Sequence, residues 1–313
     1  MKKKIYVFIL AAFIGLNAAV PAWGESYTKK EGYVSVSIVL DGDVTSWESG
    51  SPRLVEGITY VPLREFCSYM GEFTLVWSEE SHSANVKSTG LDITAREGLP
   101  YIVVNDRVFF GGGRVFISNG VLYVPIRAIA KAYGTPVEWT VREGKGVVSL
   151  TQTGVRAESA ENVYDSEVLY WLSRIISAES RGESLTGQIA VGNVVLNRVR
   201  NEQFPNSVYD VIFDTRFGVQ FTPISNGTIY NTPAESSVVA AKICLEGYTL
   251  SDNIYYFLNR SAATSLWVHN NRPYVMTIGA HSFYSLIKKR RSFDRRIFYS
   301  FAPNAPSTLS RSN

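Results

Sequence analysis

The spacing of apolar residues divides the chain into two halves. Between about residues 33 and 150, alternating runs such as VSVSIVLDG and PYIVVNDRV predict strands. From Asp165 to Glu179, apolar residues at i, i+3, i+4, i+7 and i+8 predict an amphipathic helix. The stretch from Leu185 to Val199 is apolar on most of its surface, which predicts a buried central helix. We therefore expect a strand-rich N-terminal domain and a helical C-terminal domain.

An internal repeat organises the N-terminal half. GITYVPLREFCSYMG (residues 57–71) recurs as GVLYVPIRAIAKAYG (residues 120–134), 63 positions later, and Trp77 and Trp139 follow the two copies. Each copy predicts a strand, a proline that opens a short helix and a glycine that ends it, followed by further strands. Hairpin turns are expected at Asp41-Gly42 and at Asn105-Asp106.

Two arginines, Arg64 and Arg127, occupy equivalent positions in the first turn of each predicted helix. A repeated cation can grip an anionic ligand, but ion pairs within the fold are the commoner use. We expect each arginine to form a structural salt bridge or to cap a neighbouring strand.

The repeated motif Y-V-P-[LI]-R carries a resemblance to a known module. Residues 33–150 resemble the N-terminal domain of copper amine oxidases, which also occurs in exported wall proteins of Gram-positive bacteria. The resemblance implies a non-catalytic α+β domain. His82 is the only histidine of this region, and a copper site needs several ligands, so we expect no metal here.

The two ends of the chain differ in composition from its middle. Residues 1–24 hold three lysines, an apolar run and small residues near Ala22, the pattern of a signal peptide, so we expect export. Without Lys2, Lys3 and Lys4, 28 basic residues balance 28 acidic ones, which removes any charge argument for nucleic acid. Residues 287–313 form a basic and polar tail that either contacts anionic wall polymers or membrane surface, or is a solvated end.

Polar residues 151–164 lack an apolar stripe and are interpreted as a linker. Cys67 and Cys244 lie in apolar helical contexts on either side of it, so we expect buried free thiols rather than a disulfide.

A carboxylate interrupts the apolar stripe of the first C-terminal helix. Glu179 stands at position i+11, where the pattern calls for an apolar residue. Such an acid either pairs with a cation, here Arg174 or Arg181, or is held in a partly dry cleft for acid chemistry. Gly182 should end the helix. Two helices with an acid at the end of the first suit a lysozyme-like architecture, with a small antiparallel sheet around Ile254–Leu258 and Phe221.

The C-terminal domain, residues 165–286, carries a second resemblance in five ordered motifs. These are ISAESRGESLTGQIAVGNVVLNRV, FPNSVYDVIF, QFTPISNGTIY, YYFLNRSAATSLWV and GAHSFY. They are similar to the bacterial cell-wall hydrolases typified by the spore cortex-lytic enzyme SleB and its relative CwlJ. The family pattern G-E-A-R-G-E stands here as Ala178-Glu179-Ser180-Arg181-Gly182-Glu183.

The resemblance implies a lytic transglycosylase that cleaves peptidoglycan glycan strands without a cofactor or metal. Glu179 would protonate the oxygen between N-acetylmuramic acid and N-acetylglucosamine, then accept a proton from the muramoyl C6 hydroxyl as a 1,6-anhydro ring closes. We expect a secreted monomer acting in the cell wall or spore envelope, with cortex lysis during germination as one setting and the vegetative wall as the other.

Further residues of the matching motifs are candidates for binding the glycan. They are Glu183, Gln220, Thr222, Tyr255, Asn259 and His281. Glu183 also competes with Glu179, because two carboxylates about 5 Å apart would make a retaining glycosidase. Gly182 interrupts the helix between them, which favours a structural or substrate-orienting role for Glu183.

Two other functions remain open from the sequence. One is a zinc-dependent N-acetylmuramoyl-L-alanine amidase that uses His269, His281 and a glutamate, although no H-E-x-x-H spacing is present. The other is a wall-binding accessory protein without catalysis, which the presence of Glu179 disfavours.

Overall fold

The computed structural model describes residues 34–142, 145–216, 218, 220–263 and 265–286. The predicted signal peptide and the predicted basic tail lie outside these residues. Within the described ranges, no helix combines the length and apolarity needed to cross a membrane. The N-terminal and C-terminal domains belong to one compact unit that starts at Val34.

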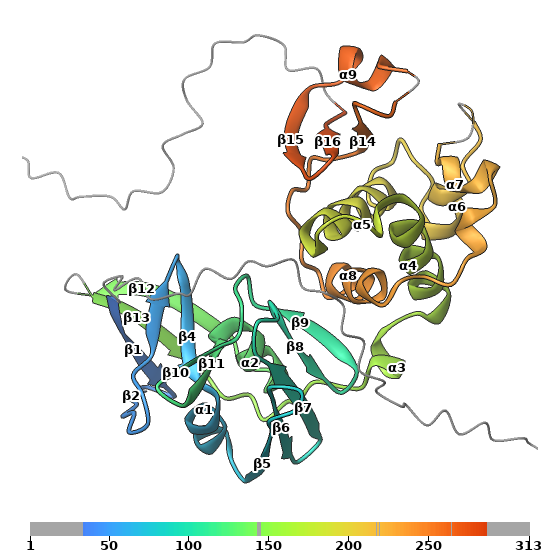
Figure 1. The fold of residues 1–313 in the computed structure, drawn as a ribbon. Coiled ribbons are helices and arrows are strands. Elements are labelled where there is room, and N and C mark those ends of the chain that lie inside the picture. The colour runs from blue at the N-terminus through green and yellow to red at the C-terminus, as the bar shows by residue number, and fades with distance from the viewer. Residues whose placement is uncertain (1–33, 143–144, 217, 219, 264, 287–313) are drawn as a thin grey trace, which may run out of the picture. The chain divides into compact units, whose positions relative to one another are not determined.

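The N-terminal domain contains two sheets, shown in Figure 1 in blue to green. The larger sheet follows the order β10-β11-β4-β3-β1-β13-β12, with β2 paired to β1. Its strands are β1 (Val34–Leu40), β2 (Asp43–Val44), β3 (Arg53–Val55), β4 (Ile58–Pro62), β10 (Phe116–Ser118), β11 (Val121–Pro125), β12 (Val137–Arg142) and β13 (Lys145–Leu150). The smaller sheet is an antiparallel meander of β5 (Phe73–Ser78), β6 (Ser83–Ser88), β7 (Leu91–Arg96), β8 (Tyr101–Val104) and β9 (Arg107–Phe110).

The two sequence copies meet across a pseudo-twofold axis. Strands β4 and β11 pair antiparallel, and Val61 lies opposite Val124, its own equivalent in the other copy. On either side, Tyr60 lies opposite Pro125 and Pro62 opposite Tyr123. The internal repeat therefore forms one symmetric module rather than two separate domains.

Both predicted hairpin turns are confirmed. Asp41 and Gly42 connect β1 to β2, and Asn105 and Asp106 connect β8 to β9, all with positive φ as two-residue hairpin loops require. Two further turns of this kind, Glu56-Gly57 and Asn119-Gly120, precede β4 and β11.

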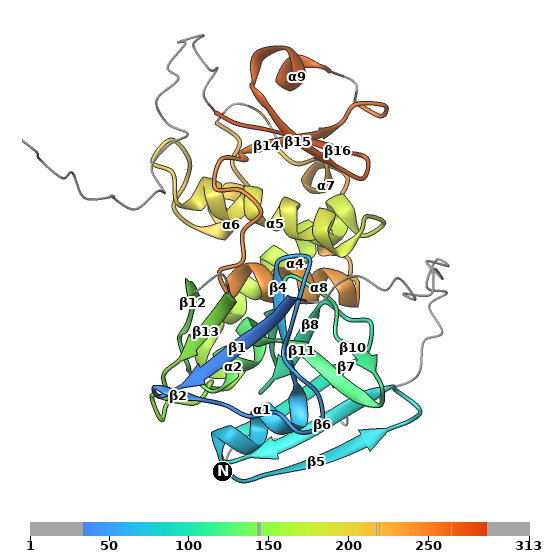
Figure 2. The ribbon, with the colours of Figure 1, turned by 90° about the vertical axis from the view of Figure 1, so that its left-hand side faces the viewer.

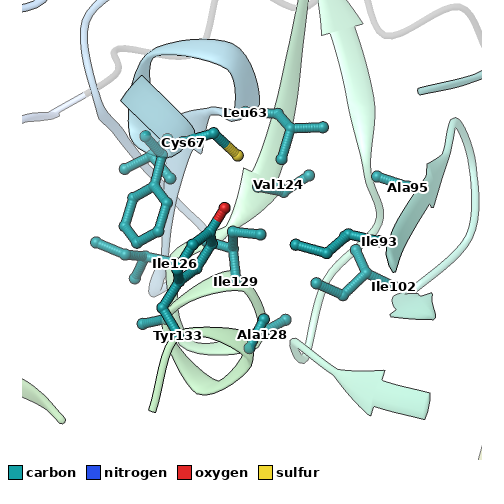
Figure 3. Close-up of a cluster of buried hydrophobic side chains, with 14 of the residues drawn as sticks. Leu63, Cys67, Ile93, Ala95, Ile102, Val124, Ile126, Ala128, Ile129 and Tyr133 are labelled. Carbon is teal, nitrogen blue, oxygen red and sulfur yellow. The ribbon is translucent and has the colours of Figure 1, made fainter. Parts of the chain in front are cut away.

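The two repeated helices are α1 (Leu63–Met70) and α2 (Ile126–Ala132), each directly after its proline. Figure 3 shows Leu63 and Cys67 of α1 facing Ile126, Ile129 and Tyr133 in the core of this domain. As expected, Cys67 and Cys244 are buried free thiols.

The segment interpreted as a linker contains the short helix α3 (Ala160–Val163). Its backbone is hydrogen-bonded to the β8–β9 turn, because Asn105 donates through Nδ2 to the carbonyl of Ala157 and accepts from the amide of Ala160 through its own carbonyl.

The C-terminal domain is built on helices, as predicted. They are α4 (Ser166–Ser180), α5 (Leu185–Val199), α6 (Val208–Ile212), α7 (Thr222–Ser225), the 3-10 turn η1 (Thr228–Tyr230), α8 (Glu235–Leu245) and α9 (Trp267–Asn271). Asp165 caps α4 and Ser184 caps α5 through side-chain hydrogen bonds. Helix α5 is buried along most of its length, between α8 and the small sheet (Figures 1 and 2).

The small antiparallel sheet has the order β14-β16-β15, with β14 (Tyr256–Asn259), β15 (Tyr274–Ile278) and β16 (His281–Tyr284). The predicted strand near Ile254–Leu258 is thus present. The expectation that Phe221 lies in this sheet is wrong: Phe221 occupies the position before α7, where Pro223 favours the start of a helix.

The end of α8 carries a buried carboxylate with three donors. Glu246 accepts hydrogen bonds from the Nε and Nη2 of Arg107 at 2.7 and 2.8 Å and from the Tyr164 hydroxyl at 2.6 Å. Lys131 Nζ lies 2.7 Å from its Oε2. Burial acts to raise the pKa of Glu246, but these donors outweigh it and hold the pKa below its usual value.

Candidate active site

The last turn of α4 brings Glu179 to the wall of a cavity. Ile175 and Ile176 of the same helix are fully buried, and Glu179 continues their stripe. Because α4 ends at Ser180, before Gly182, the carboxylate lies at the helix end beside the cavity rather than in the middle of the helix packing.

The cavity has a volume of about 1050 Å³ and gathers five of the predicted site residues: Glu179, Gln220, Thr222, Asn259 and His281. They come from α4, the segment that leads into α7, β14 and β16. Residues distant in sequence are therefore brought to one cleft, as the matching motifs implied.

The environment of Glu179 favours its neutral form. Burial raises the pKa of Glu179 to about 7. Within the described part of the chain, no hydrogen bond or ion pair is found at its carboxylate. Arg174 lies 3.6 Å from the ring centroid of Tyr170, and Arg181 is exposed. The cation pairing considered for Glu179 is thus not formed by these arginines.

His281 also lines the cavity. Its ring packs edge-to-face on Phe257, with ring centroids 5.3 Å apart, and only 8% of the residue is exposed. Burial lowers the pKa of His281, and the nearby Glu183 only partly offsets this effect. His281 thus presents a mainly neutral imidazole to the cavity near neutral pH.

Glu183 does not line the cavity; it braces the hairpin that carries His281. Its carboxylate accepts a long hydrogen bond from the amide of Ala280, at 3.3 Å, and its Oε1 lies 3.8 Å from Nδ1 of His281. Gly279 has φ +56, and a Cβ there would collide with Glu183 Oε2. The carboxylate therefore contacts the β15–β16 turn, which makes it an anchor for this turn.

Tyr255 also lies outside the set of cavity-lining residues. Its ring stacks on Phe204, and its carbonyl accepts a hydrogen bond from Nε of Arg198 at 2.8 Å. Tyr255 therefore contributes through its backbone, by fixing the segment that enters β14.

Charged residues outside the predicted site also line the cavity. Arg198, Asp214, Arg216 and Arg272 are among them. Arg198 is 4% exposed, and burial lowers its pKa to about 10. Asp214 accepts a bidentate pair of hydrogen bonds from Arg216. Arg198 had a signal of the same kind as Glu179, a charge within an otherwise apolar helix.

Aromatic side chains supply the apolar part of the cavity. They are Phe204, Phe221, Tyr256, Phe257 and Trp267. Trp267 remains 54% exposed, and the guanidinium of Arg272 lies 5.3 Å from its ring. Phe283 and Tyr284 of β16, by contrast, are fully buried and offer no ring to a ligand.

The histidines proposed for a zinc site lie in different settings. His269 Nδ1 is 3.1 Å from the Tyr284 hydroxyl, whereas His281 faces Glu183. Among the described residues, no three His, Cys, Asp or Glu side chains gather in a way that could hold a metal ion.

Comparison with known proteins identifies the C-terminal domain. Residues 182–284 match the family model "Cell Wall Hydrolase". The spore cortex-lytic enzyme of Bacillus cereus is 37% identical over 128 residues, which cover 41% of this chain and 48% of that protein. The domain belongs to the SleB/CwlJ family of cell wall hydrolases. The chain spans about half the length of this curated relative.

Two further members of the SleB/CwlJ family are similar over a comparable share of the chain. The spore cortex-lytic enzyme of Bacillus subtilis is 38% identical over 112 residues, covering 36% of this chain and 35% of that protein. The solved "catalytic domain of germination-specific lytic transglycosylase SleB" from Bacillus anthracis is 38% identical, covering 40% of this chain and 98% of that one, with a TM-score of 0.36.

The N-terminal domain has its own match. Residues 39–148 match the model "Copper amine oxidase N-terminal domain", which confirms the resemblance drawn from the repeat. The SleB/CwlJ-family domain is thus joined to a copper-amine-oxidase-N-like domain, and the cell wall hydrolase model begins three residues after Glu179.

Proposed function

We propose that this chain is an exported lytic transglycosylase that cuts peptidoglycan between N-acetylmuramic acid and N-acetylglucosamine. The observation that carries the proposal is Glu179: a carboxyl group at the wall of a large cleft, with a pKa raised to about 7 by burial. An acid of this kind keeps a proton to donate near neutral pH. The relatives' names, cortex-lytic enzyme and lytic transglycosylase, support the same reaction.

The reaction needs one carboxyl group. Neutral Glu179 donates its proton to the glycosidic oxygen, so that the bond from this oxygen to C1 of the muramoyl residue breaks and the N-acetylglucosamine side leaves as an alcohol. The Glu179 carboxylate then takes the proton of the muramoyl C6 hydroxyl while that oxygen bonds to C1. The products are a 1,6-anhydro end and protonated Glu179, and no water is consumed.

The cleft residues have roles that fit a glycan strand. Gln220, Thr222, Asn259 and His281 offer donors and acceptors to sugar hydroxyl and acetamido groups, and the exposed indole of Trp267 offers an apolar face to a pyranose ring. We infer that Glu183 acts indirectly, through the turn that holds His281. Spore cortex is the substrate that the relatives' names favour, and the vegetative wall is the alternative.

Product analysis tests the proposal. Purified cortex and vegetative peptidoglycan are digested with the full chain, and the fragments are separated and weighed by mass spectrometry. We expect muropeptides that end in 1,6-anhydro-N-acetylmuramic acid, one water lighter than a hydrolysed end.

Two other products would contradict it. Reducing N-acetylmuramic acid would mean attack by water and would direct attention to Asp214, which lines the cleft together with Glu179 among the described residues. Free stem peptides with uncut glycan would instead identify an amidase.

A further inference from the structure

The N-terminal domain contains two cavities that are equivalent under the internal repeat. The larger, about 390 Å³, is called here the Arg127 pocket, and the smaller, about 210 Å³, the Arg64 pocket. The Arg127 pocket is lined by Ile126, Arg127, Val137 and Trp139 of the second copy together with Gly57 and Ile58 of the first. The Arg64 pocket is lined by Leu63, Arg64, Leu75 and Trp77 of the first copy together with Gly120 and Val121 of the second.

The correspondence extends to the strand beside each tryptophan. Trp139 pairs across the sheet with Val148, and Trp77 pairs with Ala84; each partner lines the same pocket as its tryptophan. Each pocket therefore needs both copies: the helix and tryptophan of one, and the glycine turn of the other. The pseudo-twofold axis at Val61 and Val124 generates this exchange.

The arginines of the two pockets are available to a ligand. Arg64 and Arg127 are both exposed, and no ion pair or hydrogen bond of either side chain is found among the residues that the structure describes. The salt bridges expected from the sequence are thus not formed there. A guanidinium keeps its charge and offers a planar fork of donors that matches a carboxylate.

The tryptophans supply the apolar half of each pocket. Trp139 is 40% exposed and lies over Gly146, where a Cβ would collide with its indole ring. Trp77 is half-buried against the core. An indole beside a cation, in a pocket of this size, suits a sugar ring with an acidic substituent.

We propose that the Arg64 and Arg127 pockets are paired binding sites for peptide-bearing muramoyl units of the peptidoglycan strand, with each indole against a sugar ring and each arginine on a stem-peptide carboxylate. A single molecule can fill two equivalent pockets only if it has repeating units, as a glycan strand has, and the other domain of this chain belongs to a family of cell wall hydrolases. Occupying both sites on one polymer raises the apparent affinity above that of either site alone. The binding requires no catalysis, so it can fail or hold independently of the proposed reaction.

Pelleting with insoluble wall tests the proposal. The full chain is mixed on ice with peptidoglycan sacculi stripped of phosphate polymers by hydrofluoric acid, and centrifuged within minutes. We expect R64Q and R127Q each to weaken binding roughly 10-fold, as for loss of one charge-assisted hydrogen-bonded contact, and the double variant by about 100-fold. R142Q is the matched control, an exposed arginine of the same domain outside both pockets, and should bind within about twofold of the parent.

Two further measurements separate a built pocket from general charge attraction. Trp139→Ala should weaken binding several-fold while leaving both arginines, and amidation of the wall carboxylates should reduce parent binding to the level of the double variant. Thermal unfolding checks that each variant is folded. If Trp139→Ala does not fold, the variants of the two exposed arginines still test the proposal.

Three results would overturn the proposal. The first is a double variant that binds as well as R142Q. The second is parent binding that disappears when phosphate polymers are stripped, which would make those polymers the ligand. The third is a folded Trp139→Ala variant that binds like the parent, which would leave charge attraction alone.

Discussion

Glu179 and Glu246 are both partly buried glutamates of the C-terminal domain, at the ends of the neighbouring helices α4 and α8, yet their pKa values shift in opposite directions. Both lie at the C-terminal end of a helix, where the helix dipole disfavours a negative charge. The Glu246 carboxylate is paired with Arg107 and Lys131 and accepts a hydrogen bond from the Tyr164 hydroxyl, and these contacts lower its pKa. The Glu179 carboxylate has no such partner among the described residues, and burial raises its pKa to about 7.

The comparison shows that burial alone does not make an acid catalyst. A buried carboxylate with a complete set of donors is a structural anion, and removing it leaves cations without a partner. A buried carboxylate without them, at the wall of a cleft, holds a proton that it can transfer. The two glutamates should therefore respond to the same substitution in different ways.

The largest effect is expected for Glu179→Gln on activity. Glutamine keeps the shape of the side chain but can neither donate a carboxylic proton nor take one back, so release of anhydro-muropeptides should fall roughly 100- to 10,000-fold. Thermal unfolding at neutral pH should show a fold at least as stable as the parent, because no ion pair is lost. A variant with more than a tenth of parental activity would contradict the assignment of Glu179.

Glu246→Gln should mainly change stability. The substitution leaves Arg107, whose side chain is 13% exposed, beside a neutral amide, and breaking such a pair costs roughly 3 kcal/mol. The melting temperature should fall by roughly 5–10 °C. Cleavage measured well below this melting temperature should stay close to the parent rate, and a selective loss of activity would show that the two sites are coupled.

The pH dependence of stability should have opposite signs at the two sites. The folded pKa of Glu179 lies above its ordinary value of 4.5, so its stabilising contribution is complete below pH 4.5 and is lost as the pH rises to about 7. The loss is up to ~3 kcal/mol, from 1.36 kcal/mol per pKa unit. For Glu246, whose pKa is lowered, the contribution is present above its unfolded pKa and is lost on acidification.

Denaturant unfolding of the parent and of Glu179→Gln at pH 4.5 and pH 8 measures the first of these effects. The variant should match the parent at the lower pH and exceed it at the higher one. The cleavage rate of the parent should also decline above about pH 7, as neutral Glu179 is titrated. Equal stability of the two proteins at pH 8 would mean that Glu179 is better solvated than the structure indicates.

The sequence pattern is sufficient to predict features that depend only on neighbouring residues. The proline before each repeated helix, the two-residue turns at Asp41 and Asn105, and the carboxylate at i+11 of α4 were all visible as short-range signals. Glu179 was found because it breaks an apolar stripe, and that signal does not depend on knowing the fold.

Features that depend on distant segments were beyond such reasoning. The groups that donate to Glu246 lie on β9, on α2 and directly after α3, so no local sequence pattern connects them. Glu183 was placed with the substrate by its motif, but its contacts are with Ala280 and His281, almost 100 residues later. Arg64 and Arg127 are predicted to form salt bridges or strand caps because ion pairs are the commoner use of such cations. The pockets around them form only when the two copies pair, which no local pattern shows.

The smallest effect is expected from chelation. Glu179 is activated by loss of solvent, which needs no metal, and the candidate zinc ligands His269 and His281 are separately engaged, with Tyr284 and beside Glu183. Exhaustive dialysis against EDTA should therefore leave both the cleavage rate and the anhydro product unchanged. A loss of activity that zinc restores would show that a metal, rather than desolvation of one carboxyl group, supplies the chemistry, because a zinc enzyme depends on its ion for the reactive water. In that case Glu179 would no longer be the group that supplies the chemistry. Glu179 and Glu246 would then differ only in how they affect the stability of the fold.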